Sequence, residues 1–230
     1  MLAIVAPENK YISELLEKFS YEKVEQKNNL NVYNVNYENH KFLILTTGYG
    51  KVCVSSNLMY AINNYKINAI LLIGTTGSIN ENCNIFDVVV PKLSLQFDVD
   101  FCPNGYDPGQ IPLVDSALYY TNDDLNNCIK EVCDNTKYNY FDDIIASSDM
   151  FVCNYRLSRS IKTEYDASFV DVESGVVGQF CHLNNIPYSS IKVTSNYANN
   201  NGLRQYNSYD DRASVIAQNI AYEFVSKFFE

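Results

Sequence analysis

Residues 169–199 read FVDVESGVVGQFCHLNNIPYSSIKVTSNYAN, and this stretch predicts a strand, an acidic turn, a helix and a second strand. The first strand alternates into Val172-Glu173, where the acidic turn begins. The helix that follows has a 3.6-residue period, which places four apolar residues on one side: Val176, Val177, Phe180 and Leu183. Pro187 ends the helix, because proline disfavours helical backbone in the residue before it.

The second strand of this stretch, residues 189–193, delivers a small polar cluster at its carboxyl end. The cluster consists of Thr194, Ser195 and Asn196. Open α/β sheets bind ligands in the crevice at the carboxyl ends of their strands. We therefore expect Glu173 and Asn196 to face one crevice.

The composition is that of a globular protein and argues against several classes of partner. With 230 residues, the chain fits a single domain spanning 1–230. Hydrophobic residues make up 47% and charged residues 19%, which is ordinary for a folded domain. The net charge of −10 argues against a nucleic-acid partner, which would require a basic patch.

The N-terminus and the cysteines favour a cytoplasmic protein without a membrane segment. MLAIVAPENK carries no basic region before its apolar residues, so we interpret it as a first strand rather than a signal peptide. No apolar run approaches the length of a membrane span. The seven cysteines are scattered without close pairs, which predicts neither disulfides nor a metal site. No cofactor is expected.

Short apolar runs along the chain predict strands, and helical periods lie between several of them. This alternation indicates one α/β domain with a parallel or mixed sheet. Residues 31–37 alternate and are expected to form a hairpin with 42–46. Helices are expected around 125–133 and over 214–229. The predicted strands are 2–6, 42–46, 69–73, 88–91, 144–146, 168–172 and 189–193.

The order of motifs in the opening stretch resembles a known family of enzymes. E-S-G-x-x-x-x-F, then I-P, then T-S-N-Y-A is similar to the M-E-x-x-A, V-P and I-S-D-x-A segments of the methylthioadenosine/S-adenosylhomocysteine nucleosidases. Four further segments match motifs of that family in the same order, so the resemblance covers nearly the whole chain. These segments are the glycine turns 47–52 and 71–78, the loop 96–112 and the segment 147–152.

The resemblance implies a fold, a ligand and several binding residues. The fold is a single-domain three-layer α/β sandwich around a central mixed sheet, like that of the nucleoside phosphorylases. The ligand is a purine nucleoside, with Glu173 holding the ribose hydroxyls, Phe151 stacking on the base and Val152 bonding the base edge through its backbone. The other substrate contacts implied are Thr75, Gly77, Val172 and Ser195. The loop 96–112 corresponds to a homodimer interface in the family.

The chain departs from the family where the general acid is expected. The catalytic Asp of the family corresponds to Asn196 here, and an amide cannot supply a proton. An amide can instead donate one hydrogen bond and accept another, which suits a 6-oxopurine such as the base of inosine or futalosine. An adenine base offers an amino donor, which Asn196 could accept without protonating the ring.

A second departure concerns the glutamate that activates water in the family. Without a gap, Lys10 occupies that position. Glu8 is the nearest carboxylate after the first strand, and Glu14 is a second candidate if the register shifts. A solvated acid near a helix start is an equally good interpretation of Glu8.

Three functions remain open from the sequence. The first is a purine nucleosidase acting on methylthioadenosine, S-adenosylhomocysteine or a 6-oxopurine nucleoside, with Glu8, Asn196 and Glu173 as its catalytic residues. The second is a catalytically impaired nucleoside-binding protein of the same fold. The third, a nucleoside phosphorylase, is disfavoured because no arginine lies beside a glycine turn to hold phosphate.

Overall fold

The first strand, β1 (Leu2–Ala6), lies inside the sheet, and all five of its residues are buried. Such an unbroken apolar run is typical of a strand covered on both faces. In the computed structural model, which describes residues 1–136 and 138–230, β1 pairs in parallel with β4 (His40–Thr46) on one side and β5 (Ala69–Ser78) on the other.

The sheet is mixed, as the sequence predicted. Its main path runs β2-β3-β4-β1-β5-β11-β10-β7-β8, while β12 pairs with β5 and β6, and β6 pairs with β9. The pairing of β11 with β5 and the β2–β3–β4 meander are antiparallel. The remaining strands are β2 (Ser20–Lys27), β3 (Leu30–Tyr37), β6 (Val88–Val89), β7 (Leu93–Gln96), β8 (Tyr119–Tyr120), β9 (Tyr140–Phe141), β10 (Ile144–Ser147), β11 (Phe169–Asp171) and β12 (Tyr188–Tyr197).

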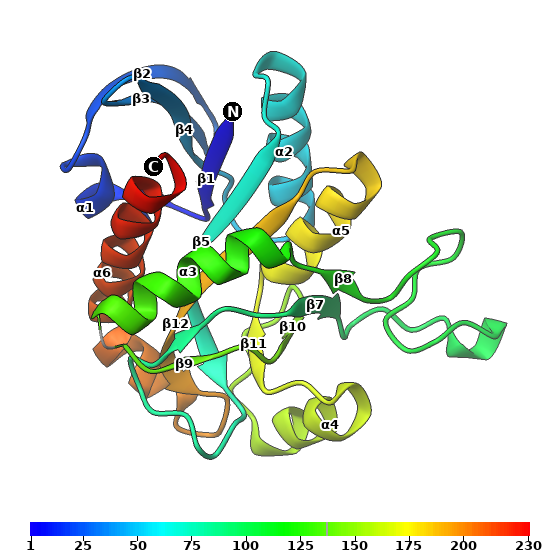
Figure 1. Ribbon diagram of the computed structural model, residues 1–230. Helices are drawn as coiled ribbons and strands as arrows, with labels where there is room; N and C mark the ends of the chain where they lie inside the picture. Colours follow the sequence, from blue (N-terminus) through cyan, green and yellow to red (C-terminus); the bar gives the residue numbers. More distant parts are fainter. Residues whose placement is uncertain (137) are drawn as a thin grey trace.

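Helices cover both faces of the sheet, which gives the three layers visible in Figure 1. One face packs against α2 (Lys51–Asn64) and α5 (Ser174–Asn184). The other face packs against α1 (Ser13–Leu16), α3 (Asp123–Thr136) and α6 (Gly202–Phe228). A smaller apolar cluster joins α4 (Tyr155–Tyr165) to β10 and β11. The predicted α/β sandwich is confirmed.

Two strands and one helix extend well beyond their predicted limits, and the extensions of the strands shape the ligand crevice. β5 continues to Ser78 and β12 to Tyr197, because the two strands stay paired past their apolar cores. A register shift between Thr194 and Asn196 interrupts this pairing. Such bulges re-aim side chains beside functional sites. α6 begins at Gly202, twelve residues before the predicted start at 214.

The prediction for Leu183 on α5 is wrong. Leu183 is 58% exposed rather than on the buried face with Val176, Val177 and Phe180. The buried face of α5 is turned toward β7 through Gly175 and Gly178, which permit a close approach. Cys181 is buried, while Leu183 points to solvent.

A loop between β7 and β8 projects from the body of the molecule (Figure 1). It contains a short 3-10 helix, η2 (Cys102–Asn104), and it exposes apolar side chains that include Leu113. This loop contains most of the segment 96–112, which the resemblance linked to a homodimer interface. Among the described residues, no helix is both long and apolar enough to cross a bilayer.

Candidate functional site

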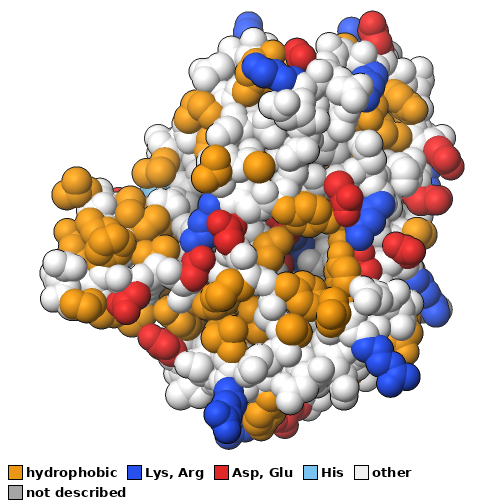
Figure 2. Space-filling model, turned by 180° about the vertical axis from the view of Figure 1, so that it is seen from behind, with side chains coloured by type: hydrophobic (Ala, Val, Ile, Leu, Met, Phe, Trp, Pro, Cys, Tyr) orange, Lys and Arg blue, Asp and Glu red, His pale blue; other side chains and the backbone are white. Residues whose placement is uncertain are grey.

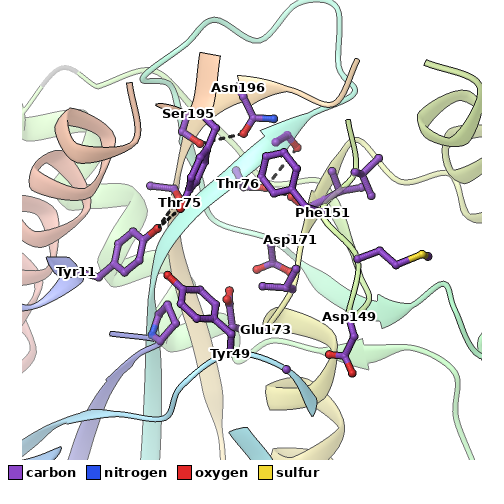
Figure 3. A pocket seen from close by; sticks show the side chains of 18 residues that line it. Tyr11, Tyr49, Thr75, Thr76, Asp149, Phe151, Asp171, Glu173, Ser195 and Asn196 are labelled. Atoms are coloured by element: carbon purple, nitrogen blue, oxygen red, sulfur yellow. Dashed lines mark hydrogen bonds between the residues drawn. The ribbon is translucent and has the colours of Figure 1, made fainter. Parts of the chain in front are cut away.

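A pocket of about 380 Å³ lies at the carboxyl ends of the central strands (Figure 3). This is the edge at which open α/β sheets bind their ligands. Its walls come from segments that lie in or follow β1, β4, β5, β10, β11 and β12, and from α6. The lining residues are Pro7, Tyr11, Tyr49, Gly50, Thr75, Thr76, Gly77, Asp149, Met150, Phe151, Val152, Val170, Asp171, Val172, Glu173, Ser195, Asn196 and Tyr206.

Nearly all of the sequence-predicted site residues line this one pocket. They are Thr75, Gly77, Phe151, Val152, Val172, Glu173, Ser195 and Asn196. The exception is Glu8, which is absent from the lining. The parts that these residues play in binding and catalysis stay predictions, but their assembly from four separate segments agrees with the expected crevice.

Glu173 caps the start of α5, and only 4% of its surface is exposed. Its Oε2 accepts a hydrogen bond from the Nζ of Lys192 at 3.0 Å. Lys192 is wholly buried, and its Nζ also lies 2.8 Å from Oδ2 of Asp171. Two carboxylates thus share one ammonium group, which leaves the buried cluster with a net negative charge when all three groups are ionised.

Burial and the shared ammonium together set the pKa values of Glu173 and Lys192. Burial raises the pKa of Glu173 to about 7, opposed by the charge of Lys192 and reinforced by that of Asp171. Burial alone would lower the pKa of Lys192, but the two carboxylates outweigh it and raise that pKa, so the ammonium stays charged. Asp171 is fixed by further donors, the hydroxyls of Ser147 at 2.5 Å and Ser174 at 2.6 Å. Glu173 is therefore the member with capacity left for a ligand.

Asn196 marks the opposite end of the pocket from Glu173 (Figure 3). Its Oδ1 accepts a hydrogen bond from the Ser195 hydroxyl at 3.1 Å, and its Nδ2 donates to the backbone oxygen of Tyr197 at 3.2 Å. One amide hydrogen and one lone pair of the oxygen remain available. Gly77 makes room for this amide, since a Cβ there would lie 3.0 Å from Nδ2.

Phe151 borders the same end of the pocket and is partly open to it. Its ring meets that of Tyr206 edge-on, with centroids 5.3 Å apart, and it is 45% exposed. Val152 beside it is buried. An aromatic face left free in a pocket suits a planar ligand.

Glu8 and Glu14 both lie away from the pocket lining. Glu8 sits at the rim with its side chain 45% exposed, where it accepts a hydrogen bond from the Tyr49 hydroxyl at 2.5 Å and pairs with Lys10 at 3.3 Å. Glu14 is exposed on α1. Strand β1 ends at Ala6, and the 3-10 turn that follows directs Tyr11, rather than an acidic residue, into the pocket.

A buried carboxylate that the sequence interpretation missed lies directly behind the pocket wall. Asp210 on α6 is 4% exposed and pairs with Lys10 at 2.7 Å. It also accepts hydrogen bonds from the hydroxyls of Tyr11 and Thr75, which both line the pocket. Its helical spacing from the buried Ser214 and Gln218 was the one available signal, and the predicted start of α6 at residue 214 excluded it.

Comparison with known proteins gives consistent matches over the whole chain. Residues 2–230 match the family described as the phosphorylase superfamily. A 5′-methylthioadenosine/S-adenosylhomocysteine nucleosidase of Buchnera aphidicola is 30% identical over 191 residues, 82% of each protein. An aminodeoxyfutalosine nucleosidase of Campylobacter jejuni is 24% identical over 227 residues, 98% of each protein.

Solved structures agree in fold. A mutant of the Helicobacter pylori MTAN with 5′-methylthioadenosine in its active site superposes with a TM-score of 0.93, at 21% identity and over 98% of both chains. The profile match and the 30% relative carry the assignment beyond fold alone. The chain belongs to the phosphorylase superfamily and, within it, to the 5′-methylthioadenosine/S-adenosylhomocysteine nucleosidase family.

Proposed function

We propose that this protein is a purine nucleosidase, which hydrolyses the N-glycosidic bond of a purine nucleoside to the free base and a ribose derivative. The observation that carries this proposal is the buried, only partly paired carboxylate of Glu173 at one end of a pocket that has an aromatic face and an amide at the other. The relatives named as nucleosidases support the same reaction class.

Glu173 supplies the electrostatic part of the reaction. As the glycosidic bond breaks, positive charge develops on the sugar, and a preorganised anion in a site with little water stabilises that charge strongly. In its ionised form, Glu173 accepts hydrogen bonds from the ribose hydroxyls while Lys192 holds one of its oxygens in place.

Asn196 determines which base fits the end of the pocket opposite Glu173. Its free amide hydrogen donates to the exocyclic oxygen of a 6-oxopurine, and its oxygen accepts from a protonated ring nitrogen. We therefore favour a 6-oxopurine nucleoside, such as inosine or futalosine, over an adenine nucleoside. The names of the relatives favour methylthioadenosine, S-adenosylhomocysteine or aminodeoxyfutalosine instead.

A second candidate function is nucleoside binding without catalysis. The observation in its favour is again Asn196, since the carboxylates of the described pocket lining, Asp149, Asp171 and Glu173, all lie away from the base end (Figure 3). A phosphorylase is the least favoured, because the described lining contains no arginine or lysine to hold phosphate.

One experiment separates these functions. The purified protein is incubated with methylthioadenosine, S-adenosylhomocysteine, adenosine, inosine and futalosine, each with and without phosphate, and the free base is quantified. Release of hypoxanthine without phosphate is the expected result. Binding by calorimetry without base release would indicate the binding protein, and release only with phosphate would indicate a phosphorylase.

A variant sharpens the choice of base. Asn196→Asp restores a protonatable group at the base end, and general acid help is typically worth ~10²–10⁴ in rate. We expect this variant to gain adenine release from methylthioadenosine while losing preference for inosine. An unchanged base preference would contradict the assignment of Asn196 to the base end.

We further propose that the protein is a homodimer and acts in the cytoplasm. The projecting loop between β7 and β8 presents the apolar surface that such an interface needs, and all seven cysteines are free thiols, as suits a reducing compartment.

A further inference from the structure

We propose that Asp210 is the positioning residue that draws the proton from the attacking water, through the hydroxyl of Thr75. This inference rests on the proposed nucleosidase function. It assigns the activation of water to the hydrogen-bond network around Asp210 on α6, rather than to Glu8 or Glu14 near the first strand.

Three donors converge on the buried carboxylate of Asp210. The Thr75 hydroxyl donates to Oδ1 at 2.5 Å, the Tyr11 hydroxyl reaches Oδ2 at 3.0 Å, and the Lys10 ammonium lies 2.7 Å from Oδ2. Lys10 makes the buried anion tolerable, because an unpaired charge in this position would be strongly unfavourable. Asp210 itself does not line the pocket, so it can act on a ligand only through Thr75 and Tyr11.

These bonds fix what the hydroxyls offer to the pocket. Each hydroxyl has one hydrogen, and those of Thr75 and Tyr11 both point to Asp210. Their remaining lone pairs are acceptors only. The Tyr206 hydroxyl, which accepts from Lys10, then donates to Tyr11 across 3.4 Å. A water molecule at this wall must therefore donate a hydrogen toward Thr75 or Tyr11, which leaves its own lone pair free for attack.

Thr75 is the better placed of the two hydroxyls. Thr75 is half-buried and open to the pocket, whereas Tyr11 is 3% exposed. The hydrogen bond from Thr75 to Asp210 is also shorter than the one from Tyr11. Burial beside Asp210 also raises the pKa of Tyr11, which keeps its phenol protonated as an orienting donor.

The step balances without any further reactant. The water oxygen forms its bond to the anomeric carbon as the bond from that carbon to the base nitrogen breaks, and the bonding pair leaves with the base. One water proton passes to Thr75 Oγ1 while the proton of Thr75 passes to Asp210. The departing base takes a proton from solvent, and Asp210 later returns its proton to solvent.

The test compares kcat and KM for the nucleoside that the wild-type protein cleaves best. Thr75→Val keeps the shape of the side chain and removes the hydroxyl, whereas Thr75→Ser keeps the hydroxyl. We expect Thr75→Val and Asp210→Asn each to lower kcat by ~100-fold with KM within about threefold, and Thr75→Ser to retain most of the activity. The double variant should be no slower than the slower single one, because the two residues act as a unit.

Two controls make the outcome decisive. Asp211→Asn removes a neighbouring exposed carboxylate from α6 and should leave kcat unchanged. Glu8→Gln tests the rim carboxylate. The proposal is overturned if Thr75→Val keeps the wild-type kcat. It is also overturned if the losses in kcat of Thr75→Val and Asp210→Asn multiply in the double variant. A large loss in Glu8→Gln with Thr75→Val unaffected overturns it too. A wild-type protein that releases no base overturns the nucleosidase function as well, which distinguishes the two failures.

Discussion

At the scale of single residues, the charge on Glu173 that serves function also lowers the stability of the fold. Its carboxylate is buried beside Asp171 and shares Lys192 with it, so the charged form that binds a ribose is the form that burial disfavours. Functional sites often contain such groups with displaced pKa values. The pH dependence of the protein should therefore report on this residue.

We predict that kcat/KM falls as the pH drops through about 7, because Glu173 then becomes protonated and loses its charge. Glu173→Gln should lower kcat/KM by ~10²–10³ and abolish this acidic limb, since an amide does not titrate. The measurement is a pH profile of both proteins, with exposed Glu164→Gln as the matched control. An acidic limb that survives in Glu173→Gln would assign it to another group.

Glu173 affects the stability of the fold in the opposite direction from activity, because the fold is less stable when its carboxylate is charged. Because the pKa of Glu173 is higher in the folded than in the unfolded state, its contribution to stability is fully present below about pH 4.5 and is lost as the pH rises through about 7. Without ligand, Glu173→Gln should thus gain about 1–3 kcal/mol over the wild type at pH 8, measured by urea unfolding.

At the scale of elements, the position of Glu173 depends on how closely α5 approaches β7. Gly178 on α5 faces Ser94 on β7, and a Cβ there would lie 2.3 Å from its hydroxyl oxygen. Gly175 meets the backbone of Leu95 in the same way. Since Glu173 precedes the first turn of α5, this contact also fixes the carboxylate in the pocket.

We predict that Gly178→Ala destabilises the protein by about 1–3 kcal/mol, although alanine favours a helix, because overpacking outweighs helix propensity. The midpoint of thermal unfolding should fall, and kcat/KM should fall with it as α5 shifts. Leu183→Ala on the exposed side of the same helix is the control and should be close to neutral. Equal stabilities of the two variants would show that the interface can relax.

At the scale of the whole molecule, the loop between β7 and β8 stands apart from the body. Apolar side chains gather on it (Figure 2), among them Leu113, which is 98% exposed, and Phe101 and Leu118. Contiguous exposed apolar surface of this kind marks an interaction site. The loop ends near α5, where Asp115 pairs with His182 at 2.7 Å.

We predict that the wild-type protein elutes as a dimer and that Leu113→Asp shifts it toward the monomer, because an interface core does not tolerate an unpaired charge. Light scattering with size-exclusion chromatography measures the mass. Leu203→Asp, which places the same charge at an exposed site on α6, should leave the dimer intact. A monomeric wild type, or a dimeric Leu113→Asp variant, would refute the assignment of this loop.

The sequence by itself predicted the fold and eight of the residues that line the pocket. Strand and helix periods are local, and the segments that carry Thr75, Phe151, Glu173 and Asn196 lie at or near the carboxyl ends of predicted strands, where α/β sheets bind their ligands. The resemblance to the nucleosidase family then indicated which strand ends form the binding site. For these residues, position along the chain was sufficient.

Only the tertiary structure decided which charges face one another. Asp210 and Thr75 are 135 residues apart in the sequence, and Asp210 is buried only because α6 starts early and packs along β5 and β12. Glu8 lies at the rim because the turn after β1 directs Tyr11 inward. Leu183 is exposed because Gly178 sets the rotation of α5. Such contacts depend on how whole elements pack, and no local period encodes that.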